Sequence, residues 1–94
     1  MTVEIILDGR LMTDRAALHD CLAEKFAFPD YYGRNLDALY DLLAAFPEPV
    51  CVTLMNANQL IAHLGRYGSA FLRTMEDVSR DNARMTFSIF DENI

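Results

Sequence analysis

The alternation of strand-like and helix-like segments constrains this chain more than any other feature. Three short, mostly apolar runs, at residues 3–7, 50–55 and 85–90, have the composition of β-strands. Two segments with helical periodicity separate each run from the next, so the predicted order is β-α-α-β-α-α-β. Strands joined through helical crossovers pair in parallel, with right-handed connections. The sequence therefore predicts an α/β fold in which a three-stranded parallel sheet packs with four helices.

Turn and capping residues set the expected limits of the first two helices. Asp8-Gly9 is a turn signal after the first strand, Thr13 or Asp14 can cap the first helix, and Pro29 is expected to end it. Asn35 is a good N-cap for the second helix. The apolar positions that define the two helices are Leu18, Cys21, Leu22 and Phe26 in the first, and Leu36, Leu39, Tyr40 and Leu43 in the second.

The second half of the chain follows the same logic. Pro47 and Pro49 break the second helix, and the run at 50–55 is so apolar that we expect a strand covered on both faces. Asn56 or Asn58 begins a short third helix, with Gly65 as its C-cap, and the fourth helix fades at Asp81-Asn82. Their apolar positions are Leu60, Ile61 and Leu64 in the third helix, and Tyr67, Phe71, Met75 and Val78 in the fourth.

Length and composition indicate one domain spanning residues 1–94. The chain is 52% hydrophobic and 23% charged, which is typical of a globular protein with a single core. We expect a monomer, because one core accounts for the apolar residues. No signal peptide is visible and no apolar stretch approaches the ~20 residues of a membrane span, so the expected location is the cytoplasm, with no membrane partner.

The cysteines and histidines give no sign of catalysis. Cys21 and Cys51 lie in apolar stretches without a CxxC pair, which favours two buried, reduced thiols. His19 falls outside the apolar stripe of its helix, and His63 lies near a helix end, so both are expected at the surface or half-buried. Because there is also no phosphate loop, zinc spacing or serine elbow, we expect no metal, no cofactor and no enzymatic activity.

The charge balance points to a basic partner. Asp and Glu outnumber Lys and Arg by 14 to 8, which gives a formal net charge of −6. Nucleic-acid binding depends on Lys and Arg that neutralise phosphates, so direct binding of nucleic acid is disfavoured. An acidic surface attracts a basic protein from a distance.

The second helix concentrates this charge on one side. Asp37 and Asp41 lie one turn apart and away from the leucine stripe, where two like charges cost a helix a few tenths of a kcal/mol. Ala38 and Ala45 leave space behind the acids, and tyrosines surround them. This arrangement is typical of a docking face for a cationic partner, although acids on an outward helix face are often simply solvated. Spacing alone leaves both interpretations open.

The segment around these acids resembles a family signature. Tyr31-Tyr32-Gly33, then Asn35-Leu36-Asp37-Ala38-Leu39, then Tyr40-Asp41 match the barstar pattern Tyr-Tyr-Gly-x-Asn-Leu-Asp-Ala-Leu followed by an aromatic residue and Asp. Barstar-family proteins of known role are intracellular, stoichiometric inhibitors of small, basic, barnase-type ribonucleases. The resemblance implies that the second helix and the loop before it enter the active site of the nuclease.

The resemblance also implies roles for single residues. Asp41 would take the place of a substrate phosphate, Asp37 would pair with basic groups at the rim, and Tyr31 would stack on a side chain of the catalytic site. Tyr40 and Phe46 would add apolar contact, and an acid near the end of the fourth helix, Asp77 or else Glu76, would complete the surface. The predicted partner-binding set is Tyr31, Asn35, Asp37, Ala38, Tyr40, Asp41, Phe46 and Asp77.

Two other functions use the same residues. Tyr40 and Phe46 stand where the best-known family member has Trp, and Arg34 places a positive charge in the loop, so a barstar-like module for a different basic protein is the alternative. A glycosidase-like carboxylate pair is disfavoured, because such pairs face each other across a cleft whereas Asp37 and Asp41 share one convex helix.

Overall fold

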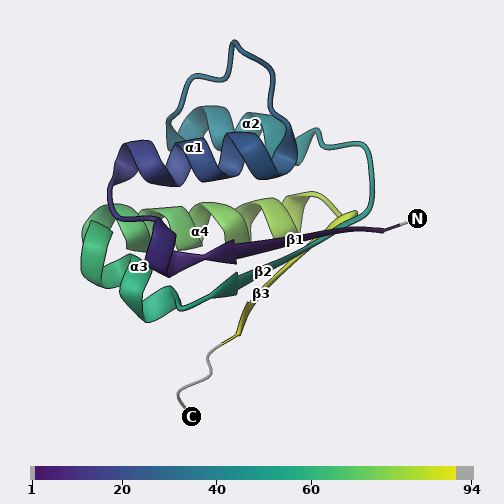
Figure 1. Cartoon of the computed structure of the whole chain (residues 1–94). Helices are drawn as coiled ribbons and strands as arrows, with labels where there is room; N and C mark the ends of the chain where they lie inside the picture. Colours follow the sequence, from purple (N-terminus) through teal and green to yellow (C-terminus); the bar gives the residue numbers. More distant parts are fainter. Residues whose placement is uncertain (1, 91–94) are drawn as a thin grey trace.

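The computed structural model describes residues 2–90 and confirms the predicted α/β order (Figure 1). The strands are β1 (Val3–Asp8), β2 (Val50–Met55) and β3 (Met85–Phe90), and the helices are α1 (Arg15–Phe26), α2 (Leu36–Ala44), α3 (Ala57–Leu64) and α4 (Arg66–Asp81). A single 3-10 turn, η1 (Gly9–Leu11), follows β1. The strands run parallel in the order β1-β2-β3, with Val3, Val50 and Met85 side by side.

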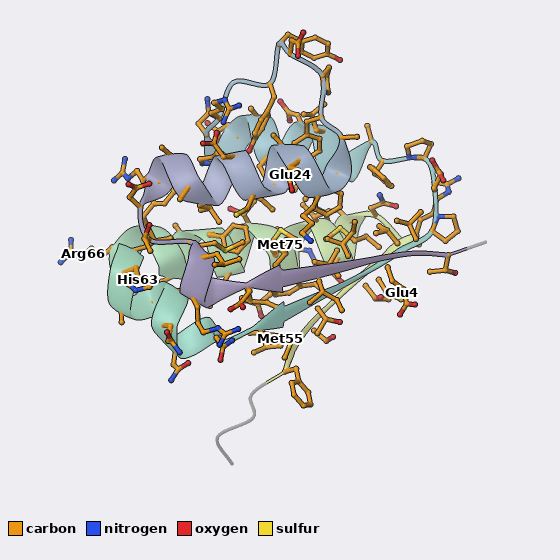
Figure 2. The ribbon with its side chains drawn as sticks, in the orientation of Figure 1. Glu4, Glu24, Met55, His63, Arg66 and Met75 are labelled. Atoms are coloured by element: carbon orange, nitrogen blue, oxygen red, sulfur yellow. The ribbon has the colours of Figure 1, made fainter. Side chains whose placement is uncertain are left out.

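Helices cover only one face of this sheet. In β2, Val50, Val52 and Leu54 are buried, whereas Thr53 and Met55 are half-exposed. Figure 1 shows α1, α2 and α4 on the same side of the strands, with α3 at the end of the sheet, and Figure 2 shows Met55 projecting from the opposite side. The expectation that β2 is covered on both faces was therefore wrong. Two right-handed crossovers that advance in the same direction, from β1 to β2 to β3, place their helices on the same face.

The open face also corrects the expectation for the cysteines. Cys51 alternates with the buried valines of β2 and is exposed, where it accepts a hydrogen bond from the Thr86 hydroxyl at 3.2 Å. Cys21 is half-buried on α1, and both thiols are free. The apolar neighbours of Cys51 in sequence are therefore a poor guide to its burial, because successive strand residues point to opposite faces.

The core lies between the covered face of the sheet and the helices. Fully buried side chains come from every helix, at the positions that helical periodicity predicts: Leu18 and Leu22, Leu39 and Leu43, Leu60, and Phe71, Met75 and Val78. Figure 2 shows Met75 in this interior. Gly9 marks a tight approach at the end of the first strand, because a Cβ atom there would lie 2.3 Å from the Asn56 carbonyl oxygen.

Local capping fixes where the first two helices begin and end. Asp14 and Asn35 are the N-caps, and each side chain accepts a hydrogen bond of 2.8 Å from the backbone N–H three residues on. Helix α1 ends at Phe26, before Pro29. Ala27 adopts a left-handed conformation, with φ 54°, and the Phe28 N–H returns to the Ala23 carbonyl at 2.9 Å. The chain then leaves the helix layer as the loop 27–35, which projects away from the sheet (Figure 1).

Candidate protein-binding surface

Helix α2 presents the two predicted acids to solvent. Leu39 and Leu43 bury the opposite side of the helix, which leaves Asp37 and Asp41 exposed one turn apart. Within residues 2–90, neither carboxylate has an ion-pair partner. Asp37 lies in the first turn, where the helix dipole favours a negative charge. Among the described residues, the helix thus carries two negative charges that have no ion-pair partner and lie on its exposed side.

The two adjacent tyrosines of the loop 27–35 have opposite environments. Tyr31 is 81% exposed, whereas Tyr32 is buried at 6%. The Tyr32 ring packs against Phe28, with 4.7 Å between ring centroids, and its hydroxyl lies 2.6 Å from Nδ1 of His19. Spacing in the sequence does not distinguish these two tyrosines, and the structure shows that Tyr32 is the one that packs beneath the loop. Tyr31 is therefore the tyrosine available to a partner.

His19 is buried, contrary to the expectation of a surface or half-buried residue. It is 2% exposed, and its Nε2 lies 2.7 Å from the Tyr67 hydroxyl on α4. Helical periodicity missed it because its partners, Tyr32 and Tyr67, are polar at one end and come from segments distant in sequence. Burial lowers the pKa of His19, and the positive charge of Arg34 lowers it further, so the imidazole is neutral at physiological pH.

Arg34 does not leave an unbalanced charge in the loop. Its guanidinium pairs with the Asp20 carboxylate on α1. The backbone of Arg34 is left-handed, with φ 54°, directly before the Asn35 cap. The pair joins the end of the loop 27–35 to α1 and offsets the positive charge that a basic partner would otherwise meet.

Tyr40 lies on the border between α2 and α4 and contacts an acid that sequence reasoning missed. Its hydroxyl donates a hydrogen bond to the Asp81 carboxylate, which also accepts from Arg80 Nε at 3.2 Å. This hydrogen bond raises the pKa of Tyr40, and together the two bonds lower the pKa of Asp81. Asp81 is one turn beyond Asp77 on the same side of α4. The signal for Asp81 in the sequence is its spacing of four residues from Asp77, which places both acids on the same side of α4.

The structure favours Asp77 over Glu76 as the acid beside α2. Asp77 pairs with Arg80 at 3.2 Å and lies near enough for its charge to help raise the pKa of Tyr40. Glu76 instead lines a shallow hollow with Leu72 and Phe87, at the side of α4 that meets β3. Asp77, Arg80 and Asp81 therefore extend the α2 surface, whereas Glu76 faces elsewhere.

Three further predicted contact residues have roles inside the fold. Asn35 is the N-cap of α2, and Ala38, whose N–H it binds, is half-buried. Phe46 is half-buried, and its ring packs edge-on against Phe26 with 5.8 Å between centroids. Buried Asn82 donates hydrogen bonds to the carbonyls of Leu43 at 2.9 Å and Phe46 at 3.3 Å. These contacts hold both ends of the acidic helix, and partner contact by these residues stays a prediction.

A hollow of about 630 Å³ lies beside the acidic helix. It is lined by Arg15, His19 and Tyr67 on one side and by Arg34, Leu36 and Asp37 on the other. The Arg15 guanidinium lies 4.2 Å above the Tyr67 ring. Over residues 2–90, no cluster of three or more His, Cys, Asp or Glu is arranged to hold a metal, and no helix has the length and apolarity needed to cross a membrane.

The fold and this surface define a small α/β protein whose exposed acids lie on a helix rather than in a catalytic cleft. The chain belongs to the barstar family, since the model of the family described as Barstar (barnase inhibitor) matches residues 2–92. It is 39% identical over 79 residues to a Bacillus subtilis (strain 168) protein named "Putative ribonuclease inhibitor YrdF", an alignment covering 83% of this chain and 87% of that one. Membership in an inhibitor family confirms that the chain is not an enzyme.

Proposed function

We propose that this protein is a stoichiometric inhibitor of a small, basic, barnase-type ribonuclease, whose active site it blocks with α2 and the loop 27–35. The observation that carries the proposal is the pair Asp37 and Asp41, exposed and unpaired on a rigid helix of a barstar-family chain. The printed name of the Bacillus subtilis relative supports the same role. We further propose that the protein acts as a monomer in the cytoplasm.

The proposed mechanism is electrostatic mimicry of the substrate. A ribonuclease site holds a phosphodiester with Arg, Lys and His, so carboxylates fixed on a helix can neutralise these groups without offering a bond to cleave. Asp41 takes the place of a phosphate, Asp37 pairs at the rim, and exposed Tyr31 stacks on a side chain of the site. Because the acids stand on a helix that is already ordered, little conformational entropy is lost on binding.

Charge also governs how fast and how tightly the complex forms. Complementary charges steer the encounter and raise the association rate, most strongly at low salt. Removing one partner of a buried, hydrogen-bonded charge pair costs about 2–5 kcal/mol, a range for which the barnase–barstar complex is itself a reference case. The acid pair should therefore dominate both the rate and the affinity.

A titration of a barnase-type ribonuclease tests the proposal. The wild-type protein should inhibit at a 1:1 ratio, and Asp41→Asn should weaken inhibition by a factor of about 30 or more, which corresponds to about 2 kcal/mol. The matched control is Glu24→Gln, which removes the same charge from the exposed side of α1 (Figure 2). Equal inhibition by both variants, or none by the folded wild-type protein, would contradict the mechanism.

A second candidate function uses the same face against a different basic protein. Tyr40 and Phe46 favour it, because they stand where the best-known family member has Trp. Under this alternative, the folded protein fails to inhibit any barnase-type ribonuclease, yet Asp37 and Asp41 still determine its binding to another basic target. Calorimetric titration with candidate basic toxins, wild type beside Asp41→Asn, separates the two functions.

A further inference from the structure

A set of side-chain hydrogen bonds centred on the buried His19 connects three separate parts of the fold. The Tyr32 hydroxyl from the loop 27–35 lies 2.6 Å from Nδ1 of His19 on α1, and the Tyr67 hydroxyl from α4 lies 2.7 Å from Nε2 of the same ring. Both imidazole nitrogens are therefore occupied. His19 and Asn82 are the buried polar residues among those the structure describes.

The hydrogen bonds of His19 with Tyr32 and Tyr67 can both form while all three side chains are uncharged. A neutral imidazole has one donor nitrogen and one acceptor nitrogen, and each tyrosine hydroxyl can either donate or accept. The groups facing His19 are Tyr32 and Arg34 from the loop, Tyr67 from α4, and Asp20 on α1 itself. A buried polar chain with all partners in place specifies a unique geometry, because any shift leaves a desolvated donor or acceptor unpaired.

The other contacts of the loop 27–35 leave its position less well defined. The Tyr32 N–H donates a hydrogen bond of 3.0 Å to the Pro29 carbonyl within the loop, and the Tyr32 ring packs against Phe28 without a hydrogen bond. The Arg34–Asp20 pair is exposed, and exposed ion pairs contribute little. The backbone bond from the Phe28 N–H to the Ala23 carbonyl ties only the first residues of the loop to α1. The bond from Tyr32 to His19 is the buried side-chain hydrogen bond that joins the middle of the loop to α1.

Tyr31 depends on this contact through the backbone. It is the residue before Tyr32, and its side chain is 81% exposed. Because Tyr32 is held at both its ring and its hydroxyl, its backbone is restrained, and this restraint limits the positions that the neighbouring Tyr31 can reach. Asn35, the N-cap of α2, follows three residues later and begins the acidic helix.

We propose that His19 is a positioning residue that fixes the loop 27–35, and with it Tyr31, in the orientation required for docking. The inference that this orientation serves docking rests on the proposed function. The inference that His19 holds the loop through the Tyr32 hydroxyl does not. Loss of that hydroxyl should loosen the loop more than it loosens the rest of the molecule.

Two substitutions provide a matched comparison. Tyr32→Phe and Tyr67→Phe each remove one hydroxyl from the same imidazole and keep an aromatic ring of the same shape. Only Tyr32→Phe cuts the connection to the loop, because Tyr67→Phe leaves the His19–Tyr32 bond in place. If His19 served only the overall stability of the fold, the two substitutions would loosen the loop 27–35 to the same extent.

The first readout is amide hydrogen exchange measured by NMR on the free protein. The reporting amides are those of residue 32, which bonds Pro29, and of Ala38, which bonds the Asn35 cap; the Val52 amide in the central strand reports the global stability. Relative to Val52, Tyr32→Phe should raise exchange at both reporting amides by about 3- to 10-fold, the effect of one net hydrogen bond. Tyr67→Phe should change their exchange by less than about twofold.

The second readout is binding to a barnase-type ribonuclease at matched fractions of folded protein. Tyr32→Phe should weaken binding by about 3- to 10-fold relative to Tyr67→Phe. Equal exchange in the loop for the two variants would overturn the positioning role, even if the wild-type protein inhibits the nuclease. A loop that loosens only in Tyr32→Phe, in a protein that inhibits no nuclease, would support the positioning role and contradict the proposed function.

Discussion

Asn82 offers a test of how the fold holds its acidic helix. It lies at the C-cap of α4 and is 5% exposed. Its Nδ2 donates to the carbonyls of Leu43 and Phe46 at the end of α2, and its Oδ1 accepts from the Arg84 N–H at 3.0 Å. One side chain thus joins the end of α2 to the turn before β3, and Asn82→Ala removes all three bonds at once.

The expected cost follows from these contacts. Each hydrogen bond contributes about 0.5–1.5 kcal/mol net, and a buried group left without a partner costs about 1–3 kcal/mol. Since water can reach part of the vacated space, we expect Asn82→Ala to lower the free energy of unfolding by about 2–4 kcal/mol. For a domain of this size, that loss lowers the Tm by about 10–30 °C.

Urea unfolding followed by far-ultraviolet circular dichroism measures this loss. The control is Asn58→Ala, an exposed position on α3, which should change stability by no more than about 0.5 kcal/mol. Asn82→Asp keeps the acceptor oxygen but places a carboxylate against the two carbonyl oxygens of Leu43 and Phe46. At pH 7 this variant should therefore lose at least as much stability as Asn82→Ala, and it should recover part of that loss when the carboxylate is protonated at acidic pH. A loss below about 1 kcal/mol in Asn82→Ala would refute the reasoning.

Three further predictions concern pH, charge and packing. The pKa of His19 is lowered below the ordinary 6.5 in the folded protein, so the unfolded chain binds a proton more readily. The free energy of unfolding should therefore be highest above pH 6.5 and decrease as the pH drops below this value. A urea midpoint that stays unchanged when the pH is lowered from about 7.5 to about 5.5 would contradict this prediction. Asp41→Asn should stabilise the free protein by a few tenths of a kcal/mol, because it relieves repulsion from Asp37, and a destabilised free protein in the same urea assay would show that the acid has an unseen structural role. Gly9→Ala should cost about 1–3 kcal/mol, because its Cβ would approach the Asn56 carbonyl oxygen to 2.3 Å, and an unchanged Tm would disprove this steric account.

The parts of the fold that local signals encode could be predicted from sequence. Helix ends are one such signal, because the capping residue is recognised by its own side chain or, for glycine, by having none. The structure confirms Asp14 and Asn35 as the N-caps of α1 and α2, and Gly65 as the C-cap of α3. The covering of the sheet could not be seen from β2 alone, since Cys51 and Met55 are apolar yet face outward. The strand order together with the handedness of the crossovers determines the covered face, and that order is a tertiary property.

The candidate site divides in the same way. Helical spacing located Asp37 and Asp41 on an outward side, because both belong to one helix. The environments of Tyr32 and His19 depend on a contact between the loop 27–35, α1 and α4, which spacing within one segment does not encode. The hydrogen bond from Tyr40 to Asp81 likewise joins helices that are distant in sequence.

The most direct test of the central claim is a double-mutant cycle across the complex. Asp41→Asn is combined with alanine substitution of an arginine that binds phosphate in the ribonuclease, and the affinity is measured for all four pairs. If Asp41 occupies the phosphate position, the two residues should couple by about 1.5 kcal/mol or more, as close charge pairs do in the barnase–barstar complex. A coupling energy near zero, with both single variants still folded, would contradict the claim that Asp41 replaces a substrate phosphate.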